Sequence, residues 1–124
     1  MRIRRVLTVL TIVAGVAAAY FQVVVPFQCN ITERALQDAT MEAMGEPVGN
    51  AAVLARENID QVEAALESCP RVPNLYMIAA ANYRLVRRLE DAEQMYRRAL
   101  ALERRPEIYF QLAMTQTELE KVDE

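Results

Sequence analysis

Apolar residues form one nearly unbroken run from residue 6 to residue 27, and beyond it they recur at helical spacing among polar ones. A helix of that length, at about 1.5 Å per residue, spans about 33 Å and can cross a hydrocarbon core of about 30 Å. No Asp, Glu, Lys or Arg lies between Arg5 and Glu33, so no charge has to enter lipid. The run predicts a transmembrane helix within residues 1–28.

The charges that flank this run predict its orientation. Arg2, Arg4 and Arg5 precede it, whereas the chain beyond it carries 17 acidic residues and eleven basic ones. Because positive flanks stay on the cytoplasmic side, we expect the N-terminus in the cytoplasm and residues 29–124 outside it. Thirteen arginines against one lysine suggest a G+C-rich bacterial genome, in which case that outside compartment is the periplasm.

A cleaved secretory signal is the alternative interpretation of the same segment. The basic start, the apolar core and the alanines at 17–19 resemble a signal with a small-residue cleavage site. The apolar character continues through Tyr20, Phe21 and Phe27, however, and such aromatic residues suit a membrane interface. We therefore favour an uncleaved anchor, and both interpretations place residues 29–124 in the same compartment.

Small and polar residues share one face of the expected span. Thr11, Gly15 and Ala19 form a small-xxx-small pattern, which lets two helix backbones approach closely in lipid. Gln22 on this face would gain from a hydrogen-bond partner. Alanine and glycine are common in any membrane helix, but the pattern also predicts lateral docking against other membrane helices. The residues of this face are Thr8, Thr11, Gly15, Ala18, Ala19 and Gln22.

The rest of the chain predicts helices and no sheet. Apolar residues with a period near 3.6, together with breaks at residues 45–50, Pro70 and Pro106, predict helices at about 30–43, 51–68, 73–86, 90–102 and from 106 to near the end. Asn30 followed by Glu33 fits a capping box that opens the first of these helices. The expected fold is all-α, with one N-terminal transmembrane helix and about five further helices.

Composition argues against catalysis. The chain contains no His, which removes Ser-His and Cys-His nucleophilic pairs and His-ligated zinc, and it has no glycine-rich phosphate loop. We therefore expect no enzymatic activity, no cofactor, no metal and no small-molecule substrate. The acidic total and the expected compartment also argue against nucleic acid.

The two cysteines lie where disulfides persist, if the orientation is right. A bridge between Cys29 and Cys69 would close a loop of about forty residues and add about 3–4 kcal/mol. The alternative is two unrelated thiols, because sequence does not give their separation. We favour the bridge.

An internal repeat with a period of 34 residues runs through the second half of the chain. Asn58, Val62, Ala65 and Leu66 correspond to Ala92, Tyr96, Ala99 and Leu100, and Tyr76 corresponds to Phe110. Residues 73–106 resemble a tetratricopeptide repeat, on the positions Tyr76, Ala80, Tyr83, Ala92, Tyr96 and Ala99. Arg87 departs from this pattern in the place of the usual turn glycine, and Pro106 comes two residues late. Residues 29–72 form a degenerate hairpin, and residues 107–124 a partial repeat.

The resemblance implies a concave groove lined by the first helix of each repeat. It assigns to that groove Asn74, Met77, Ala81, Arg84, Ile108, Gln111 and Thr115. A cluster of arginines around the central repeat could add a basic partner-binding patch, or could be solvated helix faces with weak ion pairs such as Glu93 with Arg97. These arginines are Arg84, Arg87, Arg88, Arg97 and Arg98.

The last expected helix suggests that the repeat array is completed by another protein. Repeats of this kind bury their apolar faces by stacking on neighbours. Ile108, Phe110, Leu112 and Met114 have no following helix in the sequence to cover them. We therefore expect a membrane-anchored scaffold or accessory subunit that holds other proteins of a larger membrane complex, for example an energy-transducing one. The alternative is a transient peptide-binding adaptor or assembly chaperone in the periplasm.

Overall fold

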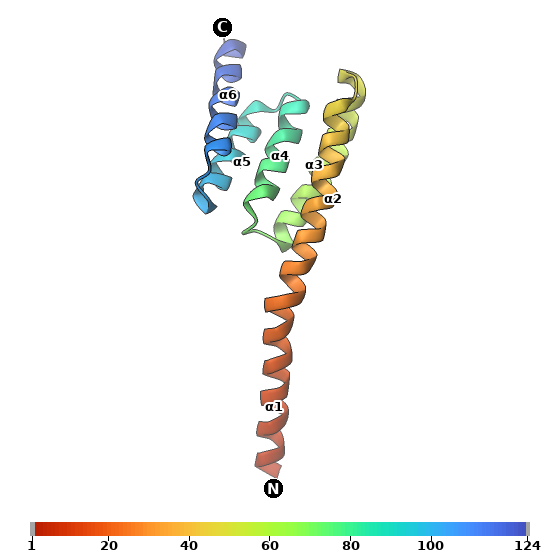
Figure 1. Cartoon of the computed structure of the whole chain (residues 1–124), viewed down its shortest axis with the longest axis vertical. Coiled ribbons are helices and arrows are strands. Elements are labelled where there is room, and N and C mark those ends of the chain that lie inside the picture. Colours follow the sequence, from red (N-terminus) through yellow and green to blue (C-terminus); the bar gives the residue numbers. More distant parts are fainter. Residues whose placement is uncertain (1, 124) are drawn as a thin grey trace. The chain divides into compact units, whose positions relative to one another are not determined.

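The computed structural model describes residues 2–123, which are almost entirely helical and contain no strand (Figure 1). In chain order the elements are α1 (Arg2–Ala19), the π-helical η1 (Tyr20–Val24), α2 (Val25–Gly45), α3 (Val48–Ser68), α4 (Pro73–Leu85), α5 (Leu89–Leu102) and α6 (Pro106–Asp123). The predicted all-α fold, with a long apolar N-terminal helix and five helices after it, is confirmed. The chain divides into two compact units, Met1–Ile31 and Thr32–Glu124, which are described separately.

The first unit carries the apolar segment. An 18-residue window within the helical stretch Arg2–Gly45 has a mean hydropathy of 2.0, and none of that window is buried in the protein. The hydroxyls of Thr8 and Thr11 donate to the carbonyls of Arg4 and Leu7, each at 2.8 Å. These bonds keep the two hydroxyls satisfied within the helix, as a lipid environment requires. The helix is long enough and apolar enough to span a membrane.

The expected helix start at Asn30 is wrong, because Asn30 lies inside α2. Pro26 has no N–H, and its ring would clash with the carbonyl one turn earlier in a regular α-helix. Here the preceding turn widens into η1, where the N–H of Val25 donates to the carbonyl of Tyr20, five residues back. The wider turn accommodates the proline, so the helix continues and Asn30 is not a cap.

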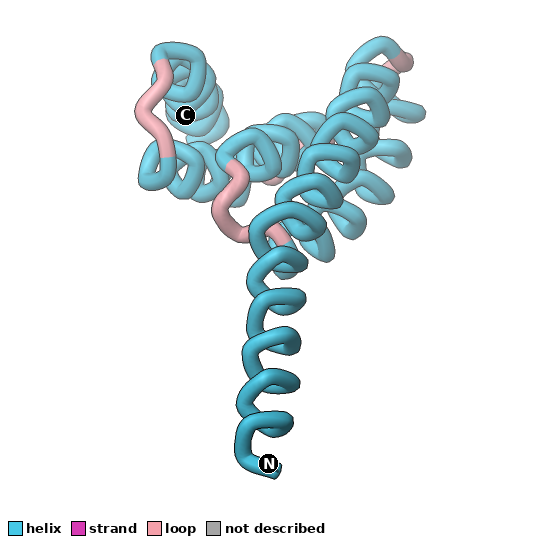
Figure 2. The backbone as a smooth tube through the Cα atoms, turned by 60° about the horizontal axis from the view of Figure 1, so that its bottom comes forward, coloured by secondary structure: helices cyan, strands magenta, loops and turns pink. Residues whose placement is uncertain are grey.

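The second unit stacks its helices as successive neighbours. α4 lies between α3 and α5, and α6 packs against α5 (Figures 1 and 2). Alanines occupy many of the contacts, and several of them are completely buried: Ala55, Ala79, Ala80, Ala92 and Ala99. Small side chains let the helix axes approach closely, and Leu75, Ile108 and Val62 fill the space beside them.

The turn between α2 and α3 is shorter than the expected break at residues 45–50. α3 begins at Val48, so Gly49 and Asn50 belong to its first turn. Pro47 takes the N-cap position with φ −55° and ψ 149°, and its carbonyl accepts from the N–H of Ala51 at 2.9 Å. Only Glu46 and Pro47 separate the two helices, and the proline both stops α2 and starts α3, so the glycines do not need to form a loop.

A buried polar cluster joins α2, α3 and α4. Nδ2 of Asn82 donates to Oγ1 of Thr40 at 2.9 Å and to the carbonyl of Ile78 at 2.8 Å, and its Oδ1 accepts from Nδ2 of Asn58 at 3.2 Å. Nδ2 of Asn58 also donates to the carbonyl of Ala39 at 3.2 Å. Because all three polar side chains are buried, these bonds fix which face of α2 meets the other two helices.

Arg87 ends α4 in a left-handed conformation, with φ 62°. The N–H of Arg88 donates to the carbonyl of Tyr83 at 2.9 Å, and the N–H of Arg87 donates to that of Arg84 at 3.0 Å. These two bonds form a Schellman motif, in which glycine is preferred at the left-handed position. The Arg88 guanidinium stacks on the Tyr83 ring, 4.8 Å from its centroid, where this motif commonly has an apolar contact. The arginine that departs from the repeat pattern thus occupies a position that suits glycine.

Candidate functional site

Two adjoining hollows in the second unit form one groove bounded by α2, α4 and α6. Each has a volume of about 470 Å³, and they share Met44, Met77 and Ala81. We call it the methionine groove. Its lining residues are Gln37, Thr40, Met41, Met44, Asn74, Met77, Ile78, Ala81, Arg84, Leu85, Tyr96, Arg87, Arg105, Gln111 and Glu118.

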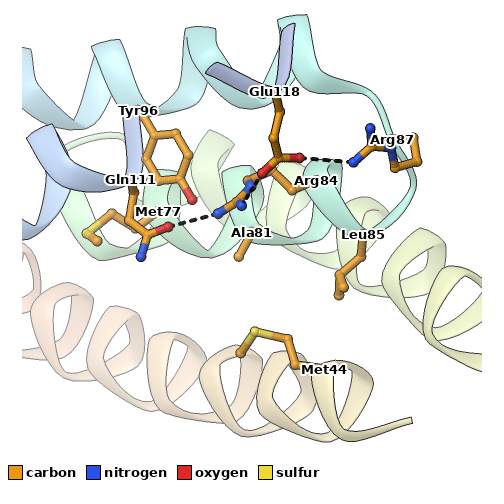
Figure 3. A pocket seen from close by; sticks show the side chains of 9 residues that line it. All are labelled: Met44, Met77, Ala81, Arg84, Leu85, Arg87, Tyr96, Gln111 and Glu118. Carbon is orange, nitrogen blue, oxygen red and sulfur yellow. Dashed lines mark hydrogen bonds and ion pairs between the residues drawn. The ribbon is translucent and has the colours of Figure 1, made fainter. Parts of the chain in front are cut away.

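The middle of the methionine groove is apolar and adaptable. Met77 and Ala81 of α4 form one wall, and Figure 3 shows Met44 of α2 on the opposite side. The side chains of Met41 and Met44 are more than half exposed, at 53% and 55%. Methionine is unbranched and polarizable, and it fits apolar partners of different shapes. This part of the groove is therefore suited to apolar side chains of a peptide or a helix.

One end of the groove is closed by a charged network on α4 and α6. Nη1 of Arg84 donates to Oε1 of Gln111 at 2.9 Å, and Nη2 of Arg84 pairs with Oε1 of Glu118. Nη1 of Arg87 pairs with the other Glu118 oxygen at 2.9 Å (Figure 3). Burial by itself would lower the pKa of Arg84, but the hydrogen bonds with Glu118 and Tyr96 outweigh it and raise that pKa. The guanidinium is therefore charged and already has a carboxylate partner.

The other end of the groove is built around Arg105, in the turn before α6. Nη2 of Arg105 donates to Oδ1 of Asn74 and lies 3.6 Å from Sδ of Met77. Nδ2 of Asn74 in turn donates to Oε1 of Glu33 on α2. Nε of Arg105 is buried without a hydrogen-bond partner, although Oε2 of Glu103 lies 3.5 Å away. This chain of contacts ties the turn before α6 to α4 and α2.

Five of the seven predicted groove residues line the methionine groove, and two do not. Asn74, Met77, Ala81, Arg84 and Gln111 lie on its surface. Ile108 and Thr115 are fully buried instead, and the hydroxyl of Thr115 donates to the carbonyl of Gln111 at 2.8 Å. Both lie on the face of α6 that also buries Leu112, because residues three, four and seven apart share a helix face. A ligand in the groove would therefore meet Gln111 and not these two side chains.

The sequence did not reveal the contribution of α2 to the groove. Met41 and Met44 are three residues apart and therefore share a helix face, and both are exposed. This spacing was the signal in the sequence that could have indicated an apolar surface on α2. Glu118 and Arg105 were also missed, because the partners that orient them lie 34 and 31 residues away. Only the folded chain brings these residues together.

The predicted arginine patch is largely neutralised. Besides the pairs with Glu118, Arg88 pairs with Asp91 at 2.7 Å and Arg97 pairs with Glu93 at 2.7 Å. The hydrogen bonds from Arg97 and then from Gln116 lower the pKa of Glu93. These contacts favour the interpretation of paired, solvated helix faces over that of a free basic surface.

Outside the groove, the remaining predicted residues lie as follows. The small-residue face of α1 is exposed, and a Cβ added at Gly15 would meet nothing within 4 Å. Cys29 and Cys69 are buried and neither is a free thiol; that they pair with each other stays a prediction. Within residues 2–123, His, Cys, Asp and Glu form no group of three that could hold a metal ion.

The groove combines an apolar, deformable middle with polar groups fixed at both ends, a lining that is suited to a polypeptide segment. No protein-family model, curated protein or solved structure matches the chain. The tetratricopeptide resemblance therefore stays a prediction from the sequence, and function has to be inferred from the site itself.

Proposed function

We propose that this protein is a membrane-anchored scaffold or accessory subunit, which binds and stabilises other proteins of a larger membrane complex on the extracytoplasmic side. The observation that carries the proposal is the methionine groove, in which exposed Met41 and Met44 face Met77 across an open apolar surface. Covering exposed methionine side chains with an apolar partner removes apolar surface from water and lowers the free energy. The bound segment would be an apolar stretch of a partner polypeptide.

The N-terminal helix supports the membrane part of the proposal. Its exposed apolar residues, among them Val9, Ile12 and Phe21, would be costly to expose to water and suit lipid contact. The three arginines before it favour a cytoplasmic N-terminus, which would put the second unit outside the cytoplasm. The exposed face with Thr11, Gly15 and Ala19 would let helices of the same complex dock in the bilayer.

The charged ends of the methionine groove would set the direction of the bound segment. Arg84 and Arg105 lie at opposite ends and are both already engaged, with Glu118 and with Asn74. A polar group of the partner can replace Glu118 or Asn74 as the hydrogen-bonding partner of the arginine. Neither guanidinium is then left buried without a partner, which keeps the free-energy cost of binding low. The apolar middle would supply the affinity, and the two ends the specificity.

Copurification from native membranes tests the proposal. The full-length protein, isolated in a gentle detergent, should bring partners at constant stoichiometry. Met44→Glu should lower their recovery about tenfold, the effect of losing about 1.4 kcal/mol of binding free energy. Val53→Glu on α3 is the matched control, because Val53 is exposed to the same degree as Met44, at 54% against 55%, and does not line the groove. A protein recovered alone and monodisperse, or an equal loss in both variants, would contradict the proposal.

A transient adaptor or assembly chaperone is the second candidate, and the flexible methionine lining favours it. Surfaces rich in methionine can repack around different partners and release them. Met77→Ala and Arg84→Ala would then leave folding intact while weakening binding. The two functions differ in exchange: a subunit should stay with its partners when excess unlabelled protein is added, whereas an adaptor should be replaced within minutes.

A further inference from the structure

The methionines of residues 2–123 differ in how easily solvent reaches them. Met41 and Met44, on the α2 wall of the methionine groove, are 53% and 55% exposed. Met77 on the α4 wall and Met95 on α5 are only partly exposed, and Met114 on α6, outside the groove, is 39% exposed. The two thioethers that solvent reaches most easily therefore both belong to one wall of the groove.

Met77 is shielded in a second way. Nη2 of Arg105 donates to Sδ of Met77 over 3.6 Å. An electrophilic oxidant attacks a sulfur lone pair, and a lone pair that accepts from a guanidinium is a poorer nucleophile. Within residues 2–123 the sulfur atoms of Met41 and Met44 accept no hydrogen bond. Solvent access and nucleophilicity thus both single out the α2 pair for oxidation.

We propose that Met41 and Met44 form a reversible modification site, at which a hypohalous acid such as hypochlorous acid oxidises each thioether to a sulfoxide. Each sulfur gives up two electrons and gains the oxygen atom, while the chlorine leaves as chloride and the hydroxyl proton passes to water. Methionine sulfoxide reductases reverse the change: the oxygen leaves as water, and two reductase thiols join in a disulfide.

This oxidation turns the α2 wall of the methionine groove from apolar to polar. A sulfoxide oxygen is a strong hydrogen-bond acceptor, and an apolar segment that covers it offers no donor, so burial is costly. Since Met41 and Met44 are exposed, water hydrates both sulfoxides while the groove is empty, and the helices keep their fold. Oxidation thus closes the groove to apolar partners. This consequence rests on the proposed function, whereas the modification site does not.

Dilute hypochlorous acid, added to the purified full-length protein in detergent, tests the site without any partner. Tryptic cleavage after Arg34 and Arg56 releases Met41 and Met44 in one peptide, in which tandem mass spectrometry separates them. Both should gain oxygen several-fold faster than Met77, circular dichroism should keep the native helix content, and the two epimer-specific reductases together should restore both thioethers. Oxidation of Met77 at an equal rate, a loss of helix, or failure of the reductases to restore the pair would overturn the inference.

Partner recovery tests the consequence for binding. The purified chain is oxidised and the oxidant quenched before solubilised membranes are added, so that only this chain is modified. Oxidation should lower recovery about tenfold, and reductase treatment should restore it. In Met41→Leu with Met44→Leu, recovery should be the same before and after oxidation, whereas Met114→Leu should stay as sensitive as the wild type. An equal loss in the Leu pair would overturn the switch; recovery of no partner by the unoxidised chain would instead contradict the proposed function, and the oxidation map would still decide the site.

Discussion

Replacing Asn82 with alanine removes the amide at the centre of the buried cluster between α2, α3 and α4. The side chain of Asn82 is completely buried and makes three hydrogen bonds, to Thr40, to the carbonyl of Ile78 and with Asn58. Each net hydrogen bond contributes about 1 kcal/mol, and the space left behind adds a further cavity cost. We therefore expect Asn82→Ala to lower the free energy of unfolding by at least about 3 kcal/mol.

Asn58→Ala should be similarly costly for a different reason. It leaves Oδ1 of Asn82 buried without its donor, and an unsatisfied buried acceptor costs about 1–3 kcal/mol. The double variant should lose less than the sum of the two single losses, because the bond between the two amides can be lost only once. Asn50→Ala is the control, since Asn50 is exposed and makes one long bond of 3.4 Å to Glu46.

Urea unfolding of the full-length protein in detergent micelles, followed by circular dichroism, measures these differences. Hydrogen exchange adds a local readout: in Asn82→Ala, amides of the second-unit part of α2 should exchange faster relative to those of α5. A loss for Asn82→Ala no larger than that for Asn50→Ala, or strictly additive single losses, would refute the account of this cluster as the link between the three helices.

Three further predictions concern other parts of the chain. Arg87→Gly should be more stable than Arg87→Ala by about 1 kcal/mol in urea unfolding, because alanine keeps the cost of φ 62°; equal stability of the two would contradict a strained cap. Burial, and next the hydrogen bond to Glu63, raise the pKa of Tyr83 to about 12 in the folded chain. Between about pH 10 and pH 12 this phenol therefore ionises mainly in the unfolded chain, so the free energy of unfolding should fall as the pH rises through this range. Tyr83→Phe should remove this part of the alkaline loss, and an unchanged pH profile would count against it. If Cys29 and Cys69 pair with each other, intact mass under non-reducing conditions should be about 2 Da below the reduced mass, and a thiol-blocking reagent should not label the unreduced protein; labelling of both cysteines would exclude the bridge.

Helix number and most helix ends could be predicted from the sequence because their signals are local. Pro73 and Pro106 start α4 and α6 where the sequence predicted, and the predicted end at residue 68 matches the end of α3. A proline in the first turn is compatible with a helix and needs no tertiary contact to act. The prediction of a helix start at Asn30 was wrong because it depended on the chain before it. A capping box predicts a helix start only where the preceding residues are not already helical, and here they belong to α2.

The candidate site was predictable only in part, because it depends on how the helices are rotated against one another. Gln111 and Ile108 are three residues apart on α6, yet one lines the groove and the other is buried. Residues three positions apart differ by only about 60° around a helix axis, so a small rotation of α6 about its own axis decides which side chain faces the groove. The spacing of apolar residues in the sequence does not fix that rotation accurately enough. The contribution of Met44 and the link from Asn58 to Asn82 depend on contacts between helices that are distant in the sequence.

Native mass spectrometry of the full-length protein, released from membranes in a gentle detergent, tests the proposed scaffold role most directly. The account predicts assemblies well above the 14.1 kDa of this chain, with different polypeptides in fixed ratio. Met44→Glu should shift the population toward the free chain, and Val53→Glu should not. Detection of the wild-type protein only at 14.1 kDa, or only as multiples of itself, would contradict a scaffold that holds other proteins.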